Sequence, residues 1–187
     1  MPSYESTEIL GQGRFLQLEL LTYRDGAGRE RKWEAAMRCH NQGAVLMIPV
    51  LKPSERYVLI RQYRPPVKGF VIEFPAGLID PDEAPRETAL RELAEETGYT
   101  GTIAWMGRPT SSSAGLTGES VVLALMEIDE NAPENQTPAA CLEEGEEIEV
   151  IVVAKNEVSA FLHARENAGD ILDSRLAAYF MGHGLAW

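Results

Sequence analysis

The sequence of 187 residues is poor in cysteine and in basic side chains. Its two cysteines, Cys39 and Cys141, have neither CxxC nor metal-ligand spacing, so a disulfide framework is not expected. The 17 lysines and arginines are outnumbered by 29 aspartates and glutamates, which gives a formal net charge of −12. This balance argues against a nucleic-acid partner, because proteins that bind the phosphate backbone carry a basic face. An anionic ligand would need local arginines or a metal ion.

Long apolar runs are also missing. No segment approaches the roughly 18 consecutive apolar residues of a membrane span, and the N-terminus lacks the basic-then-apolar pattern of a signal peptide. We therefore expect a soluble cytoplasmic protein that has no membrane partner. A chain of this length, with 44% hydrophobic and 25% charged residues, is typical of a globular fold with its own core.

Apolar periodicity predicts an α/β fold. Residues 15–23 and 31–39, joined by a turn at 25–28, predict an N-terminal β-hairpin that packs against the main sheet or a second subunit. Further strands are expected at 44–51, 57–63, 70–74, 103–106, 121–128 and 148–153. Two helices are expected at 156–167 and 173–181, the second capped by Asp173. The acidic, proline-containing segment 129–145 predicts a long mobile loop, and the whole pattern favours a mixed sheet between helices.

Carboxylates are concentrated in residues 77–99, which predict a loop followed by a helix. Asp82 is the expected cap, Pro85 lies in the first turn and Gly98 is placed to end the helix. At about 100° per residue, one face carries Ala89, Leu90, Leu93 and Ala94, and the opposite face carries Glu92, Glu95 and Glu96. Like-charged neighbours weaken an isolated helix by about 0.2–0.5 kcal/mol per pair, whereas a hard cation prefers clustered oxygens. A solvated acidic face and a metal site are both open on this pattern alone.

The order of residues in this segment resembles the signature of the Nudix hydrolases. The matching positions are Gly77, Glu83, Arg91, Glu92, Leu93, Glu95, Glu96 and Gly98, while Tyr99 replaces the final aliphatic residue. The resemblance implies an α/β/α sandwich and metal-dependent cleavage of a diphosphate linked to another group. It also implies that Glu92, Glu95, Glu96 and the Ala76 carbonyl bind Mg²⁺, with Mn²⁺ as a possible substitute. Arg91 would then orient a carboxylate such as Glu83.

The flanking segments 61–66 (RQYRPP) and 72–77 (IEFPAG) resemble the ADP-ribose or ADP-sugar pyrophosphatase branch. This implies Mg²⁺-dependent hydrolysis of ADP-ribose, and of other ADP-sugars, to AMP and ribose 5-phosphate. Arg64 suits a diphosphate because a guanidinium binds such oxygens bidentately; a surface salt bridge is the alternative. Two other functions remain open: hydrolysis of another nucleoside diphosphate derivative, such as GDP-mannose, another nucleotide sugar or an oxidised nucleotide, or nucleotide binding without catalysis.

The same resemblance assigns base binding to the N-terminal region. In this branch, aromatic side chains enclose the adenine, some of them from the partner subunit of a homodimer. The matching positions here are Phe15 and Trp33, followed by Glu34 and Arg38, although ordinary core packing would also explain either aromatic. We expect residues 1–42 to serve dimerisation and base binding, and residues 43–187 to form the hydrolase domain.

Two loops complete the expected site. Residues 113–119 (SAGLTGE) resemble the substrate loop of the branch, with Gly115 and Leu116 as binding residues and Ala114 in place of a proline. In a late acidic loop, Glu146 matches a glutamate that activates water or completes a metal shell. Glu144 and Glu147 are nearby alternatives, and a solvated loop without a chemical role is the other interpretation.

Overall fold

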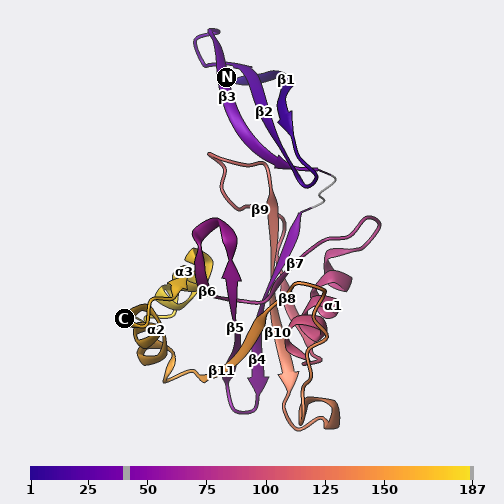
Figure 1. The fold of residues 1–187 in the computed structure, drawn as a ribbon, viewed down its shortest axis with the longest axis vertical. Coiled ribbons are helices and arrows are strands. Elements are labelled where there is room, and N and C mark those ends of the chain that lie inside the picture. The colour runs from indigo at the N-terminus through magenta and orange to yellow at the C-terminus, as the bar shows by residue number, and fades with distance from the viewer. Residues whose placement is uncertain (40–42, 186–187) are drawn as a thin grey trace.

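The computed structural model describes residues 1–39 and 43–185, and in these ranges the chain forms two sheets and three α-helices. The helices are α1 (Pro85–Thr97), α2 (Val158–Asn167) and α3 (Ser174–Gly182). The smaller sheet is antiparallel and contains β1 (Ser3–Gln12), β2 (Leu16–Arg24) and β3 (Glu30–Arg38). It projects from the body of the molecule in Figure 1.

The main sheet is mixed, as expected. Its strands are β4 (Ala44–Lys52), β5 (Arg56–Arg64), β6 (Gly69–Glu73), β7 (Ala76–Leu78), β8 (Thr102–Met106), β9 (Thr110–Ser111), β10 (Ser120–Asp129), β11 (Ile148–Ala154) and β12 (Ile171–Leu172). The order is β12-β6-β5-β4-β10-β8, with β11 beside β5, β7 beside β4 and β9 beside β10. The pairs β10–β4 and β12–β6 are parallel, and the other pairs are antiparallel.

Strand β4 explains the three-layer packing. Successive side chains of a strand point to opposite faces of the sheet. Val45 and Met47 therefore join one core with Leu93 of α1. Leu46 and Ile48 join a second core with helices α2 and α3. Figure 1 shows α1 on one side of the sheet and the other two helices opposite it. Burial on both faces accounts for the continuous apolar run of this strand, and the predicted α/β/α sandwich is confirmed.

The N-terminal region contains one strand more than the sequence predicts. The hairpin of β2 and β3 is confirmed, with a turn in which Gly28 N–H donates to the Asp25 carbonyl at 2.9 Å and Gly28 has φ 77°. Strand β1 adds to its edge, and all ten of its residues are exposed. Such a strand has no core-facing side, which explains why its sequence lacks a clear alternation. The expected boundary after residue 42 falls at residues 40–42, which lie outside the described part of the chain.

Helix α1 begins later than expected. Ala84, not Asp82, is its N-cap, and Pro85 is the first helical residue. Glu87 Oε2 accepts the Ala84 N–H at 3.0 Å, while Asp82 has φ 68° and belongs to the preceding turn. The end at Gly98 is confirmed, because this residue adopts φ 74° and its N–H donates to the Ala94 carbonyl.

The buried face of α1 is rotated from the predicted one. Leu90 is 38% exposed, whereas Glu96, expected on the polar face, is only 4% exposed. The neighbours of the helix explain this difference, because β7 packs along it and the segment between β10 and β11 covers its last turns. Cys141 N–H donates to the Glu95 carbonyl at 2.8 Å, and a side chain at Gly98 would collide with Ala139.

The long segment between β10 and β11 is anchored rather than free along its length. It contains a short 3₁₀ helix, Pro133–Asn135, and Asn135 is buried. The Asn135 side chain accepts the Thr100 N–H at 2.8 Å and donates to the Asp129 carbonyl at 2.9 Å.

No helix in the described ranges is both long and apolar enough to cross a membrane.

Candidate active site

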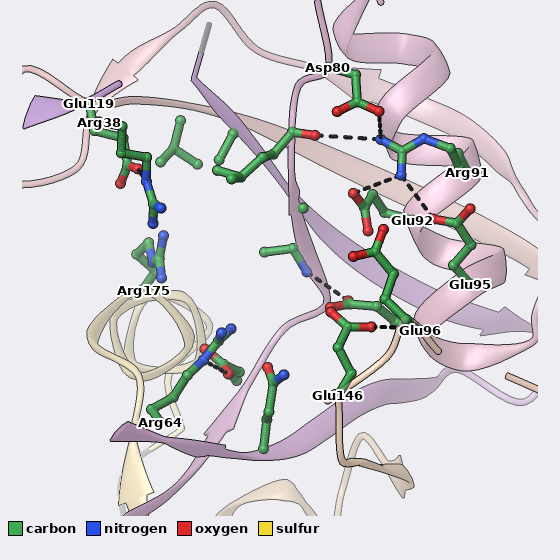
Figure 2. A pocket seen from close by; sticks show the side chains of 18 of the residues that line it. Arg38, Arg64, Asp80, Arg91, Glu92, Glu95, Glu96, Glu119, Glu146 and Arg175 are labelled. Atoms are coloured by element: carbon green, nitrogen blue, oxygen red, sulfur yellow. Dashed lines mark hydrogen bonds and ion pairs between the residues drawn. The ribbon is translucent and has the colours of Figure 1, made fainter. Parts of the chain in front are cut away.

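A pocket of about 640 Å³ opens between α1, α3 and the ends of β5, β6 and β7. Figure 2 shows that its two sides differ in charge. The carboxylate wall comes from α1 and the loop before β11, and consists of Glu92, Glu95, Glu96, Glu143 and Glu146. The arginine wall lies opposite and consists of Arg38, Arg64 and Arg175. A ligand between these walls meets carboxylates on one side and guanidinium groups on the other.

A glycine brings the carboxylate wall close to the sheet. Gly77 lies in β7, and a Cβ atom added to it would be 1.9 Å from Cδ of Glu92. Only a residue without a side chain permits this approach. The absence of a side chain at this position of β7 therefore leaves room for the Glu92 carboxylate.

Arg91 organises the carboxylates on α1. Its Nε and Nη2 donate to the two oxygens of Glu83 at 2.9 and 2.8 Å. Its Nη1 donates to Glu92 and to Glu95, each at 2.9 Å. The Arg91 guanidinium, followed by the Thr88 hydroxyl, lowers the pKa of Glu83 to about 2. The sequence-based pairing of Arg91 with Glu83 is thus present, and one guanidinium orients three glutamates.

Glu96 and Glu92 carry the chemistry expected of metal ligands. Glu96 Oε2 accepts the Ala76 N–H at 3.0 Å. Burial, with the charges of Glu92 and Glu146, raises the pKa of Glu96 to about 8. Burial also raises the pKa of Glu92, against the opposing effect of Arg91. Buried carboxylates that repel one another are the oxygen donors that a hard divalent cation neutralises.

This donor set fits Mg²⁺ or Mn²⁺ by its chemistry. Within residues 1–39 and 43–185, no three acidic, histidine or cysteine side chains already converge in ligand geometry. Glu92 and Glu95 instead point to Arg91, so small rotations of these side chains would be part of binding a cation.

Glu146 reaches the pocket from the loop before β11. Glu146 Oε2 accepts the N–H of Glu143 at 3.0 Å, and the Glu146 N–H donates to the Glu143 carbonyl at 3.1 Å. This small turn holds the Glu146 side chain beside α1, and both residues line the pocket. Glu144 and Glu147 are exposed and do not contribute to the lining. Among the three candidate bases, the geometry favours Glu146.

Each guanidinium of the arginine wall has a carboxylate beside it. Arg38 Nε donates to Glu119 at 2.6 Å, and Arg64 Nε donates to Glu73 at 2.8 Å. Burial raises the pKa of Glu73, an effect that Arg64 opposes. Arg64 is therefore not a plain surface ion pair, because its carboxylate partner is buried and its guanidinium lines the pocket.

The comparisons with known proteins agree with the fold and the signature. The model of the NUDIX domain matches residues 40–173. The chain belongs to the Nudix family. It is 37% identical over 172 residues to the ADP-ribose pyrophosphatase of Saccharomyces cerevisiae. The aligned region covers 87% of this chain and 74% of the yeast protein. It is 35% identical over 166 residues to the ADP-sugar pyrophosphatase of Mus musculus. Here the aligned region covers 85% of this chain and 76% of the mouse protein.

One solved structure, the crystal structure of an ADP compounds hydrolase, aligns with a TM-score of 0.65. It covers 87% of this chain and 83% of that chain at 20% identity, which is a likeness of fold. The predicted relationship to the Nudix family and to its ADP-ribose pyrophosphatase branch is confirmed.

The structure brings only part of the predicted Nudix substrate site together. Arg38 and Arg64 line the pocket, whereas the other predicted substrate-binding residues do not: Phe15, Trp33, Glu34, Gly115 and Leu116. Phe15 is 66% exposed and Trp33 is 49% exposed, so neither is a core residue. Trp33 Nε1 donates to the Gly115 carbonyl at 3.1 Å, and Ala36 N–H donates to the Leu116 carbonyl at 2.9 Å. These contacts attach the small sheet to the predicted substrate loop.

Sequence reasoning missed several pocket residues, among them Gln62 and Arg175. Gln62 lies on β5, two residues before Arg64, so the strand alternation that directs Arg64 inward could have identified it. Its Oε1 is buried and has no hydrogen-bond partner in the described part of the chain. Arg175 lies at the start of α3, two residues after the predicted cap Asp173. A basic residue in the first turn opposes the helix dipole, and this was the available signal.

Proposed function

We propose that the protein hydrolyses the diphosphate bond of ADP-ribose, and of other ADP-sugars, to AMP and ribose 5-phosphate. The reaction depends on Mg²⁺, and Mn²⁺ is a possible substitute. The observation that carries this proposal is the two-walled pocket, because a diphosphate can meet a cation held by the carboxylate wall and arginines on the other side. The names of the yeast and mouse relatives support the choice of an ADP-sugar.

The residues of the pocket divide the chemistry between them. A bound divalent ion neutralises diphosphate oxygens and lowers the pKa of water. Glu92, Glu95, Glu96 and the Ala76 carbonyl are the proposed ligands. Arg91 keeps the carboxylates of the helix oriented through the hydrogen bonds described above.

The remaining pocket residues act on the water and the substrate. Glu146 is the proposed acceptor of the proton of the attacking water, or a further ligand. Arg64 and Arg38 bind diphosphate oxygens, because their Nε atoms contact the paired carboxylates while the rest of each planar guanidinium can donate bidentately.

Base recognition is proposed to require a homodimer. Phe15, Trp33 and Glu34 are exposed on the small sheet and lie outside the pocket of a single chain. The same sheet exposes several large apolar side chains: Ile9, Leu10, Leu16 and Leu18. A second copy that covers this surface would bury those side chains and bring residues 1–42 of one protomer near residues 43–187 of the other. Light scattering that detects only monomer at micromolar concentration would contradict this arrangement.

The test of the activity is incubation of the purified protein with ADP-ribose and Mg²⁺, followed by chromatography of AMP. The wild-type protein should release AMP, and chelation of the metal should stop the reaction. Glu96→Gln should abolish turnover with an unchanged circular dichroism spectrum. Unchanged activity of this variant would remove Glu96 from the proposed metal site.

A different nucleoside diphosphate derivative is the second candidate, because the pocket of one chain contains none of the predicted base-binding aromatics. A panel that includes GDP-mannose, other nucleotide sugars and oxidised nucleotides separates the two candidates by their kcat/KM values. Binding of ADP-ribose without hydrolysis of any compound in the panel would instead favour a non-catalytic module.

A further inference from the structure

Arg175 occupies a position that is unfavourable for helix stability. It is the second residue of α3, where the unpaired N–H groups and the helix dipole give a positive potential. Basic side chains are favoured in the last turn of a helix and disfavoured in the first. The helix dipole therefore gives no reason for a positive side chain at this position.

The N-cap residue fixes the direction of this guanidinium. Asp173 accepts the backbone N–H groups of Arg175 and Leu176 at 2.9 and 3.2 Å. The same carboxylate accepts Nε of Arg175 at 3.1 Å and Nη2 at 2.9 Å. Asp173 is itself fixed to the main sheet, because its N–H donates to the Ile72 carbonyl at 3.0 Å. One edge of the guanidinium is thus bound to a rigid partner.

The other side of the Arg175 guanidinium is available to the pocket. Arg175 lines the cavity together with Arg38 and Arg64, and Figure 2 places it between them, across from Glu92, Glu96 and Glu146. In the described ranges, Nη1 of Arg175 makes no hydrogen bond. A guanidinium held at one edge, with a free N–H group at another, is preorganised for an oxyanion.

We propose that Arg175 is a substrate-binding residue, which donates to the diphosphate oxygens that face away from the carboxylate wall. The inference rests on the proposed function, since it takes the ligand to be a diphosphate. Three arginines can then surround the side of the diphosphate that the carboxylates cannot approach. Asp173 acts through Arg175 and is a positioning residue.

The test measures binding without turnover. The probe is methylenediphosphonate, which has a diphosphate's charge but a P–C–P bridge that is not hydrolysed, titrated calorimetrically in the presence of Mg²⁺. Arg175→Gln should lower the affinity about tenfold, the effect of losing one charge-assisted contact. Arg175→Lys should give an intermediate affinity, because it keeps the charge but loses the planar geometry.

The matched control is Arg165→Gln. Arg165 on α2 also contacts an aspartate, Asp170, through its Nε at 2.6 Å, but it does not line the pocket. This variant should bind the probe as the wild-type protein does. Equal affinity of wild type and Arg175→Gln, equal losses in Arg175→Gln and Arg165→Gln, or absence of wild-type binding would each overturn the proposal.

Kinetics give a second readout. With ADP-ribose as substrate, Arg175→Gln should raise KM more than it lowers kcat, whereas a purely structural defect would reduce the fraction of active enzyme and leave KM unchanged. If ADP-ribose is not hydrolysed but the calorimetric loss persists, the proposed function fails while the assignment of Arg175 stands.

Discussion

Gly77 and Glu92 are packed so closely that a methyl group on the glycine would lie 1.9 Å from the carboxyl carbon of the glutamate. The glycine belongs to the main sheet and the glutamate to α1, so the end of the Glu92 side chain lies directly against the backbone of β7. The glycine of the signature thus has a steric role, and its φ angle does not require a glycine.

Gly77→Ala should therefore displace the Glu92 carboxylate from its position beside β7. Because the displaced atoms end a flexible side chain that faces the pocket, we expect little change of the midpoint in urea but a large loss of kcat. Gly26→Ala is the control, because a Cβ atom there meets nothing within 4 Å. Wild-type kcat in the Gly77 variant would show that the close contact has no part in the site.

The Arg91–Glu83 pair should make stability depend on acid pH. Arg91 lowers the pKa of Glu83 from its ordinary value of 4.5 to about 2, so the pair contributes fully above pH 4.5 and is lost as the pH falls towards 2. Glu83→Gln should cost about 1–3 kcal/mol at pH 6 and less at pH 3. The measurement is urea unfolding of both proteins at each pH, with the exposed Glu8→Gln as a control. A difference that does not change with pH would contradict the assignment.

Asp170 should matter for stability and not for catalysis. Its carboxylate is 5% exposed and accepts Arg61 Nη2 at 3.1 Å and Arg165 Nε at 2.6 Å; burial opposes these contacts, but the net pKa of Asp170 is lowered. Asp170→Asn leaves Arg165 without its anion and Arg61 with only the exposed Glu149, and should cost about 2–4 kcal/mol. Glu149→Gln, which removes an exposed partner of Arg61, should cost less than about 1 kcal/mol. Equal losses in the two variants would be inconsistent with this reasoning, as would a changed KM.

Trp33 provides a test of the base-binding proposal. Trp33→Ala should raise KM for ADP-ribose roughly tenfold, because stacking of a base on an aromatic ring contributes about 1–3 kcal/mol. The value of kcat should change little. Trp105→Ala is the matched control, since Trp105 on β8 is similarly exposed, at 55%, and has no predicted contact with the base. If both variants keep the wild-type KM, adenine does not stack on Trp33.

Local sequence signals predicted where α1 begins and ends better than they predicted which of its side chains are buried. Pro85 at the first position and the left-handed Gly98 at the end follow from backbone preferences that operate within a few residues. The burial of Glu96 and the exposure of Leu90 depend instead on β7 and on the loop around Cys141. Those neighbours are brought to the helix by the tertiary fold, so helical periodicity alone places the two side chains on the wrong faces.

The candidate site shows the same division between local and tertiary information. Three glutamates of the signature, Glu92, Glu95 and Glu96, lie within two turns of one helix, and their order was enough to identify them. Arg175 is far from Arg64 in the sequence, and the two are brought together because β12 pairs with β6 and directs α3 towards the pocket. No spacing rule predicts that pairing, since β12 has only two residues.

The pairing of each pocket arginine with a carboxylate affects how a substrate arrives. Glu119, Glu73 and Asp173 offset the three guanidinium charges at long range, so an approaching anion experiences the field of a protein with a formal net charge of −12. Attraction begins only at hydrogen-bonding distance. Moderate salt shortens the range of the repulsion, and the rate of encounter with a negatively charged nucleotide should therefore increase with ionic strength, opposite to the behaviour of an electrostatically steered enzyme.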